Sequence, residues 1–222
     1  AVSDRRKAFL FCGLHSLDRD LREAGSRLIV KSGKPLDVLK EVVRNWKPEV
    51  ITAEEDFTPY ALQRDQTIQN YLPLQPVQGQ LVHHPMAIRS KSGKPYRVYT
   101  PFSKAWKALL PSSLAPLPAP ESIPFPDIPV QTDELPEAVE NTFFPAGEAE
   151  ALARLKHFTE KGSAPPVYSY AQDRNRMDLD GTSSLSPYFH FGMLSMRTAA
   201  AAALQAARAA SSGDRKSTRL NS

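Results

Sequence analysis

Hydrophobic and polar positions in the first eighty residues alternate between helical and strand periods. Apolar residues at helical spacing predict a helix over 35–47 that opens on a proline, and a second helix over 59–72 with Leu62, Ile68 and Leu72 facing inward. Short β-rich runs at 49–53 and 74–77 predict strands. Strands separated by helices of this length pair in parallel through right-handed crossovers. The sequence therefore predicts an α/β fold with a doubly wound, Rossmann-like parallel sheet.

Two flanking segments extend this pattern. Before the first of these helices, Ser16 is expected to cap a helix that Gly25 ends, and the run 27–31 is expected to be a strand. After the last strand comes a loop over 90–94, and then an aromatic cluster that is expected to anchor a helix over 101–110 on the α/β domain: Tyr96, Tyr99, Phe102 and Trp106.

The remaining chain divides into a linker and the start of a second domain. Nine of the 20 prolines lie between Pro111 and Pro145, which excludes a long helix or a central strand there. We expect residues 1–110 to form the α/β domain, 111–146 an interdomain linker, and 147–212 the beginning of an all-helical domain, with amphipathic helices over 147–162 and 195–210. Residues 213–222 resemble a translated sequencing adapter, so a disordered, non-native tail is expected.

Composition excludes several classes of protein. No apolar run approaches the ~20 residues that span a bilayer, and the N-terminus lacks an apolar signal core, so a cytoplasmic location is expected. Cys12 is the single cysteine, which excludes an internal disulfide and a cysteine-built metal site, and no other metal-ligand pattern occurs. The net charge of +4 is compatible with a polyanionic partner. A monomer is expected.

Candidate chemistry is concentrated in 170–195, YAQDRNRMDLDGTSSLSPYFHFGMLS. Asp180 and Gly181 are expected to turn the chain, and four hydroxyls follow on Thr182, Ser183, Ser184 and Ser186 near the start of a helix. Such an arrangement suits a phosphate or a pyrophosphate, because donors at a helix N-terminus are unpaired and the helix dipole favours an anion. Arg174 and Arg176 add positive charge nearby. An ordinary Ser/Thr-rich capping turn is the alternative interpretation.

This segment resembles the opening of the flavin-binding region of the DNA photolyase and cryptochrome family. The similarity comprises a tyrosine, an arginine four residues later, and then DGTS-x-LSPY-x-HFG. Three further segments resemble the family in the expected order, namely GSRLIV at 25–30 with Gly33, DFTPYALQRD at 56–65, and GKPYRVYTPFSKAW at 93–106. The chain is identified by these motifs as a member of the family, of a class I-like type, that lacks the first strand and most of the flavin domain.

The resemblance implies roles for particular residues. Tyr170, Thr182, Ser183, Ser184, Leu185 and Ser186 would hold flavin adenine dinucleotide (FAD), the last five around its pyrophosphate. Arg174 matches a position that contacts the DNA phosphate backbone. The family usually has an arginine or lysine where this chain has Ser184, so one cationic contact is absent. No catalytic residue is expected within the chain.

The resemblance also implies a second, antenna chromophore in the α/β domain. Folate-binding members have Asn and Glu at the positions of Tyr60 and Ala61, so a deazaflavin, a flavin or no antenna is as plausible as a folate. The implied partner is ultraviolet-damaged DNA, in which reduced FAD, excited by light, would donate an electron to a flipped-out pyrimidine dimer. The alternatives are a cryptochrome-type photoreceptor without repair activity, and a truncated scaffold that holds no cofactor.

Overall fold

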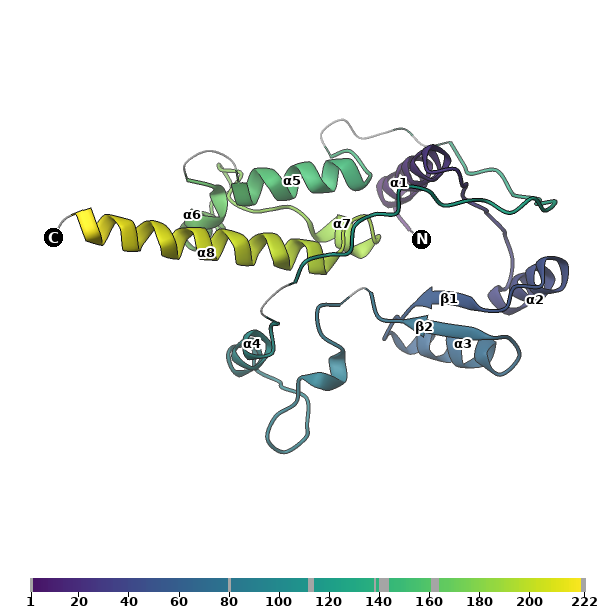
Figure 1. Ribbon diagram of the computed structural model, residues 1–222, viewed down its shortest axis with the longest axis horizontal. Coiled ribbons are helices and arrows are strands. Elements are labelled where there is room, and N and C mark those ends of the chain that lie inside the picture. The colour runs from purple at the N-terminus through teal and green to yellow at the C-terminus, as the bar shows by residue number, and fades with distance from the viewer. Residues whose placement is uncertain are drawn as a thin grey trace. The chain divides into compact units, whose positions relative to one another are not determined.

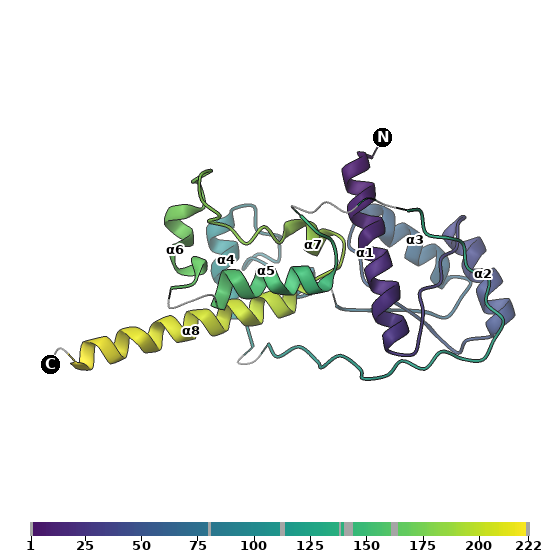
Figure 2. The ribbon, with the colours of Figure 1, turned by 90° about the horizontal axis from the view of Figure 1, so that it is seen from above.

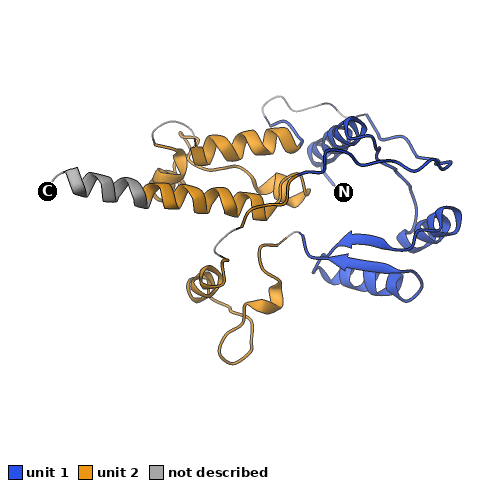
Figure 3. Cartoon of the chain, viewed as in Figure 1, with its two compact units in different colours: residues 1–80, 119–147 blue, residues 81–118, 148–222 orange. Residues whose placement is uncertain are grey.

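The computed structural model of the chain describes residues 2–79, 81–111, 114–137, 139, 144–160 and 164–220, with 211–220 described by their backbone only. The chain separates into two compact units (Figure 3). Unit 1 comprises residues 1–80 and 119–147, and unit 2 comprises residues 81–118 and 148–222. Residues 81–110, which we expected in the α/β domain, group with the helical unit, and residues 119–146 of the expected linker group with the α/β unit.

Unit 1 contains three helices and a parallel sheet (Figure 1). The order is α1 (Asp4–Glu23), α2 (Pro35–Trp46), β1 (Ile51–Glu54), α3 (Pro59–Gln69) and β2 (Leu74–Val77). The two strands pair in parallel with Ile51 opposite Leu74, and α3 is their crossover connection. The α/β class and the parallel pairing are therefore as predicted, and the sheet has two strands within the described residues.

Local chemistry explains the ends of the unit 1 helices. Thr58 caps α3, because its side chain accepts a hydrogen bond from the Ala61 N–H at 3.4 Å, and Pro59 follows in the first turn. Helix α2 begins at a proline and ends where Lys47 adopts a left-handed φ of 48°. The N–H of Lys47 donates to the carbonyl of Val43 at 2.9 Å, which closes the last turn.

Three expectations for unit 1 were wrong. Ser16 does not cap a helix, because it lies inside the 20-residue α1 and is buried. Leu62 faces outward, with 53% of its surface exposed, whereas Ile68 is buried as predicted. The run 27–31 is extended, but it does not join the sheet. Its backbone pairs instead with the linker, where the N–H of Asp133 donates to the carbonyl of Val30 at 2.8 Å.

Unit 2 is helical within the described residues. Its elements are a 3₁₀ turn, η1 (Pro85–Ala87), and the helices α4 (Tyr99–Ala108), α5 (Glu148–Glu160), α6 (Pro166–Asp173), α7 (Ser186–His190) and α8 (Met196–Leu220). Helices α5 and α8 lie side by side in both views (Figures 1 and 2). The core residues between the elements of this unit include Leu155, Leu185, Tyr188, Leu194 and Ala206.

Helices α4, α5 and the start of α8 occur close to where the sequence predicted them, whereas α6 was not predicted. Helix α8 continues to Leu220, through the segment for which a disordered tail was expected. The non-native origin of that segment stays a prediction. Residues 161–162 of the expected helix 147–162 and the last two residues of the expected tail lie outside the described residues. None of the described helices is both long enough and apolar enough to cross a membrane.

Candidate functional site

The Asp180–Ser186 segment passes so close to the end of α6 that only glycine fits at one position. A Cβ atom added at Gly181 would lie 2.6 Å from the carbonyl oxygen of Asp173, which is backbone and cannot move aside as a side chain would. The turn that the sequence predicted at Gly181 is therefore built on a close backbone approach. This approach fixes where the hydroxyl-bearing residues begin.

The backbone conformation after the turn changes from left-handed at Ser184 to right-handed at Leu185. Ser184 has a positive φ of 51°, whereas Leu185, the residue before α7, has φ −86° and ψ −9°. Successive residues of opposite hand direct their N–H groups toward one concavity, an arrangement that binds anions. The side chain of Leu185 is 3% exposed, so it anchors this concavity in the core of unit 2. Serine tolerates a positive φ poorly, which marks Ser184 as a strained position.

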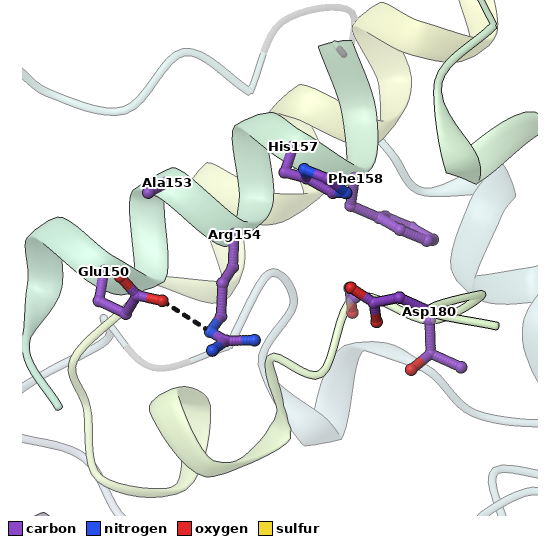
Figure 4. Close-up of a pocket in the computed structure, with 8 residues that line it drawn as sticks. Glu150, Ala153, Arg154, His157, Phe158 and Asp180 are labelled. Atoms are coloured by element: carbon purple, nitrogen blue, oxygen red, sulfur yellow. Dashed lines mark ion pairs between the residues drawn. The ribbon is translucent and has the colours of Figure 1, made fainter. Parts of the chain in front are cut away.

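The hydroxyl groups of the segment lie on one side of a pocket. Thr182 and Ser183 line a cavity of about 260 Å³ whose other wall is helix α5 (Figure 4). The hydroxyls of Thr182 and Ser184 are 3.4 Å apart. Ser186 is the first residue of α7 and is exposed. Because α7 has only five residues, its dipole is small, and the main-chain donors before it are the more important electrostatic feature.

The α5 wall of the pocket contains a polar network that sequence reasoning missed. Arg154 forms an ion pair with Glu150 at 3.0 Å and donates a hydrogen bond from Nε to the hydroxyl of Tyr188 at 3.1 Å. Tyr188 is fully buried, and this burial raises the pKa of its hydroxyl. The four-residue spacing of Glu150 and Arg154 on a predicted helix was the available signal. The network ties α5 to α7 and so holds the two walls of the pocket together.

Tyr170 lies beside the end of the pocket that Phe158 lines. Its ring packs edge-on against Phe158, with ring centroids 6.0 Å apart and an angle of 90° between the planes, and Phe158 lines the pocket. Tyr170 is 41% exposed, so much of its surface is open to a ligand. The structure thus brings Tyr170, Thr182 and Ser183 to neighbouring positions around Phe158.

The two arginines after α6 have different environments. Arg174 is exposed, and its guanidinium lies 5.9 Å from the centre of the Tyr170 ring. Arg176 forms an ion pair with Asp178, in which Nε donates to Oδ1 at 3.0 Å, and this hydrogen bond lowers the pKa of the Asp178 carboxyl. The charge of Arg176 is therefore largely balanced locally. Arg174 is the better placed of the two for an external anion.

Several other residues that could be considered for a site do not line this pocket. His83 packs edge-on against Trp106, with ring centroids 5.2 Å apart, and its Nε2 is 3.2 Å from the Trp106 carbonyl oxygen, so it is a packed side chain. Tyr60 and Ala61 lie in the first turn of α3, where Tyr60 is 69% exposed and Ala61 is buried. Within the described residues, His, Cys, Asp and Glu side chains do not gather in threes or more as a metal site would require.

Comparison with known proteins gives a consistent result. The DNA photolyase family profile matches residues 1–121. The chain is 32% identical to an uncharacterized 31.6 kDa protein of Synechococcus sp., over 93% of this chain and 76% of that protein. It is 35% identical to the deoxyribodipyrimidine photo-lyase of Thermus thermophilus, over 90% of this chain and 44% of that enzyme.

Solved structures agree with the sequence comparisons. The crystal structure of a class III photolyase from Agrobacterium tumefaciens superimposes with a TM-score of 0.81 at 25% identity, over 90% of this chain and 44% of that protein. Cryptochromes are also among the matches. The chain therefore belongs to the DNA photolyase family, as its motifs indicated. It spans somewhat less than half the length of the curated photo-lyases that it matches.

Proposed function

We propose that the protein containing this chain binds FAD at the Asp180–Ser186 segment and repairs cyclobutane pyrimidine dimers in DNA with light. The observation that carries this proposal is the backbone of Ser184 and Leu185, whose opposite hands suit an anion, within a segment that resembles the flavin-binding motif of the family. When bound, FAD would supply the light-driven electron transfer. The chain's own residues would bind and orient the nucleotide.

The charges around the pocket indicate which part of the nucleotide each surface suits. Glu150 and Asp180 both line the 260 Å³ cavity, and among the described residues the only arginine or lysine that lines it is Arg154, which is already paired with Glu150. Two carboxylates oppose a doubly charged pyrophosphate. We therefore assign the pyrophosphate to the main-chain donors of Ser184, Leu185 and Ser186. The cavity, with the hydroxyls of Thr182 and Ser183, suits an uncharged hydroxyl-bearing part of the nucleotide.

This assignment also explains how an anion would be held although Ser184 replaces the family's usual basic side chain. Family members usually have a basic side chain at the position of Ser184, whereas here the anion would be held by backbone donors alone. Backbone donors on a rigid turn need no reorganisation on binding, because Gly181 and Leu185 already fix their positions. Arg174, exposed on the rim beyond Tyr170, would contact a DNA phosphate.

The test uses the product of the intact gene. We expect it to purify with bound flavin and to split the pyrimidine dimers in an irradiated oligonucleotide under blue light but not in darkness. The double variant Thr182→Val with Ser183→Ala is expected to lower the ratio of flavin absorbance to protein absorbance, because it removes two hydroxyl groups from residues that line the cavity. Colourless protein that could not be reconstituted with FAD would overturn the proposal.

A cryptochrome-type photoreceptor is the second candidate, because cryptochromes are among the proteins that this chain resembles. It would share the flavin site but not the repair chemistry. Protein that retains flavin and changes its absorption spectrum in light, yet leaves the dimers in an irradiated oligonucleotide intact, would favour this candidate. The same purified sample therefore separates the two functions.

A further inference from the structure

One long stretch of the chain contains basic residues but no acidic ones. Residues 66–120 contain six lysines and arginines and no aspartate or glutamate. Removing those six from the chain's 28 basic residues leaves 22 against 24 acidic ones, so the rest of the chain is slightly acidic. This stretch has a net charge of +6, and without it the net charge of the chain would be −2. All six basic residues lie between Arg89 and Lys107, which we call the basic segment.

The structure exposes five of these cations and gives the sixth a structural role. Arg89 donates from its guanidinium to the carbonyl of Gly93 at 3.2 Å and contacts the sulfur of Met86. It therefore stabilises the turn that contains Lys91 and Lys94. The five exposed cations are Lys91, Lys94, Arg97, Lys104 and Lys107.

The cations are displayed on ordered backbone. Ser90 and Lys94 close a tight turn, in which the Ser90 N–H donates to the Lys94 carbonyl at 2.9 Å and Gly93 adopts a φ of 76°. Lys104 and Lys107 lie three residues apart on α4 and therefore share one face of that helix. The ring of Tyr96 packs against Phe102 with centroids 6.4 Å apart, which connects the loop to the first part of α4.

Several cations elsewhere in the described chain form ion pairs with carboxylates, but those of this segment do not. Ion pairs join basic and acidic side chains in α1, α3 and α5 and after α6, whereas within the described residues none involves a cation of the basic segment. Like charges three residues apart on a helix repel each other, as Lys104 and Lys107 do, so the free protein has an unfavourable interaction here. An external polyanion would relieve that repulsion.

We infer that the five exposed cations of the basic segment form a second surface that binds the phosphate backbone of duplex DNA. The inference rests on the proposed function, which makes DNA the polyanion. Two observations favour DNA over an anionic membrane. The basic segment belongs to unit 2, which also contains Arg174, and α4 has only ten residues, so its apolar surface is short for a helix that lies in a membrane interface. Tyr99, 77% exposed between these cations, adds an aromatic surface for sugar or base contacts.

The test measures how binding of the chain to an undamaged duplex depends on salt. Each phosphate contact contributes about 0.9 to the slope of log affinity against log salt concentration. The variant Lys91→Gln, Lys94→Gln, Arg97→Gln is expected to lower that slope by about 2.7, and Lys104→Gln with Lys107→Gln by about 1.8. Fluorescence anisotropy gives the slopes, and circular dichroism checks that each variant keeps its helix content.

A matched control tests whether the position of the removed cations matters, and not only their number. Arg5→Gln, Arg6→Gln, Arg44→Gln removes three exposed cations of unit 1 and is expected to leave the slope nearly unchanged. Equal losses in the control and the Lys91 triple variant would overturn the inference, as would loss of binding to phosphatidylserine vesicles without loss of duplex binding.

Arg174→Ala distinguishes failure of this inference from failure of the proposed function. It is expected to lower the slope by about 0.9 on damaged and undamaged duplexes alike. If Arg174→Ala has this effect and the basic-segment variants do not, the second surface is excluded and the proposed function stands. If the wild-type chain and the intact gene product bind no duplex, both fail.

Discussion

The two units of the chain differ most in how they bury their apolar residues. Helix α2 of unit 1 is strongly amphipathic, yet none of its residues is buried. Helix α5 of unit 2 has a less regular pattern but buries Ala151 and Leu155 against its neighbours. Amphipathic pattern therefore predicts where a helix forms, and the number of covering elements decides how much it stabilises the fold. The candidate site lies in the better-packed unit, where Leu185 and Tyr188 are buried.

The largest expected effect compares one leucine from each helix. Leu155→Ala removes a side chain that is 6% exposed and is expected to lower the free energy of unfolding by about 2–5 kcal/mol. Leu39→Ala on α2 removes a side chain that is only partly buried and is expected to cost about 1 kcal/mol or less. Urea unfolding followed by circular dichroism measures both. Equal losses in the two variants would contradict the difference in packing between the units.

Much of the secondary structure could be predicted because it depends on local signals. Proline at a helix start, apolar residues at helical spacing and short β-rich runs predicted α2, α3 and both strands. The run 27–31 shows where local signals fail, because its backbone pairs through Val30 with Thr132 and Asp133, about a hundred residues later in the sequence. No local pattern contains that information.

The candidate site also has a part that the sequence predicted and a part that it did not. The hydroxyl-rich segment after Gly181 could be found from the sequence, because its residue types are contiguous and resemble a family motif. The wall formed by Glu150 and Arg154 could not, because it comes from a helix more than twenty residues away and depends on the buried hydroxyl of Tyr188. The positive φ of Ser184 was also not predictable, since serine rarely adopts that conformation.

The second expected effect concerns that backbone conformation. Ser184→Ile places a β-branched residue at a φ of 51° and is expected to destabilise the segment by about 1–2 kcal/mol, whereas Ser184→Gly removes the strain. Both variants lose the hydroxyl, so its loss does not account for a difference between them, which reflects backbone preference and side-chain bulk. In the intact gene product, the isoleucine variant is expected to lose flavin during purification and the glycine variant to retain it. If both variants lose flavin equally, the hydroxyl rather than the backbone holds the nucleotide.

The smallest expected effect concerns the linker that lies along unit 1. The carboxylate of Asp133 accepts a hydrogen bond from the backbone N–H of Ser32 at 2.7 Å, and the neighbouring Thr132 hydroxyl accepts one from Val30 at 2.9 Å. Hydrogen bonding to the Ser32 side chain and backbone lowers the pKa of the Asp133 carboxyl. A carboxylate with a lowered folded-state pKa stabilises the fold above its unfolded value of about 3.9, and this stabilisation is lost as the pH falls through the folded-state pKa.

Asp133→Asn is therefore expected to weaken attachment of the linker at neutral pH and to leave little difference from the wild type at acidic pH. The change in overall stability is expected to be small, because Asp133 is exposed. Hydrogen exchange at the amide of Ser32 is the more sensitive measurement, since that N–H loses its charged acceptor directly. Protection of this amide that is equal in the two proteins at neutral pH would show that the carboxylate does not hold the linker. Neighbouring Glu134→Gln keeps the same charge change without the bond to Ser32, and it is expected to leave the protection unchanged.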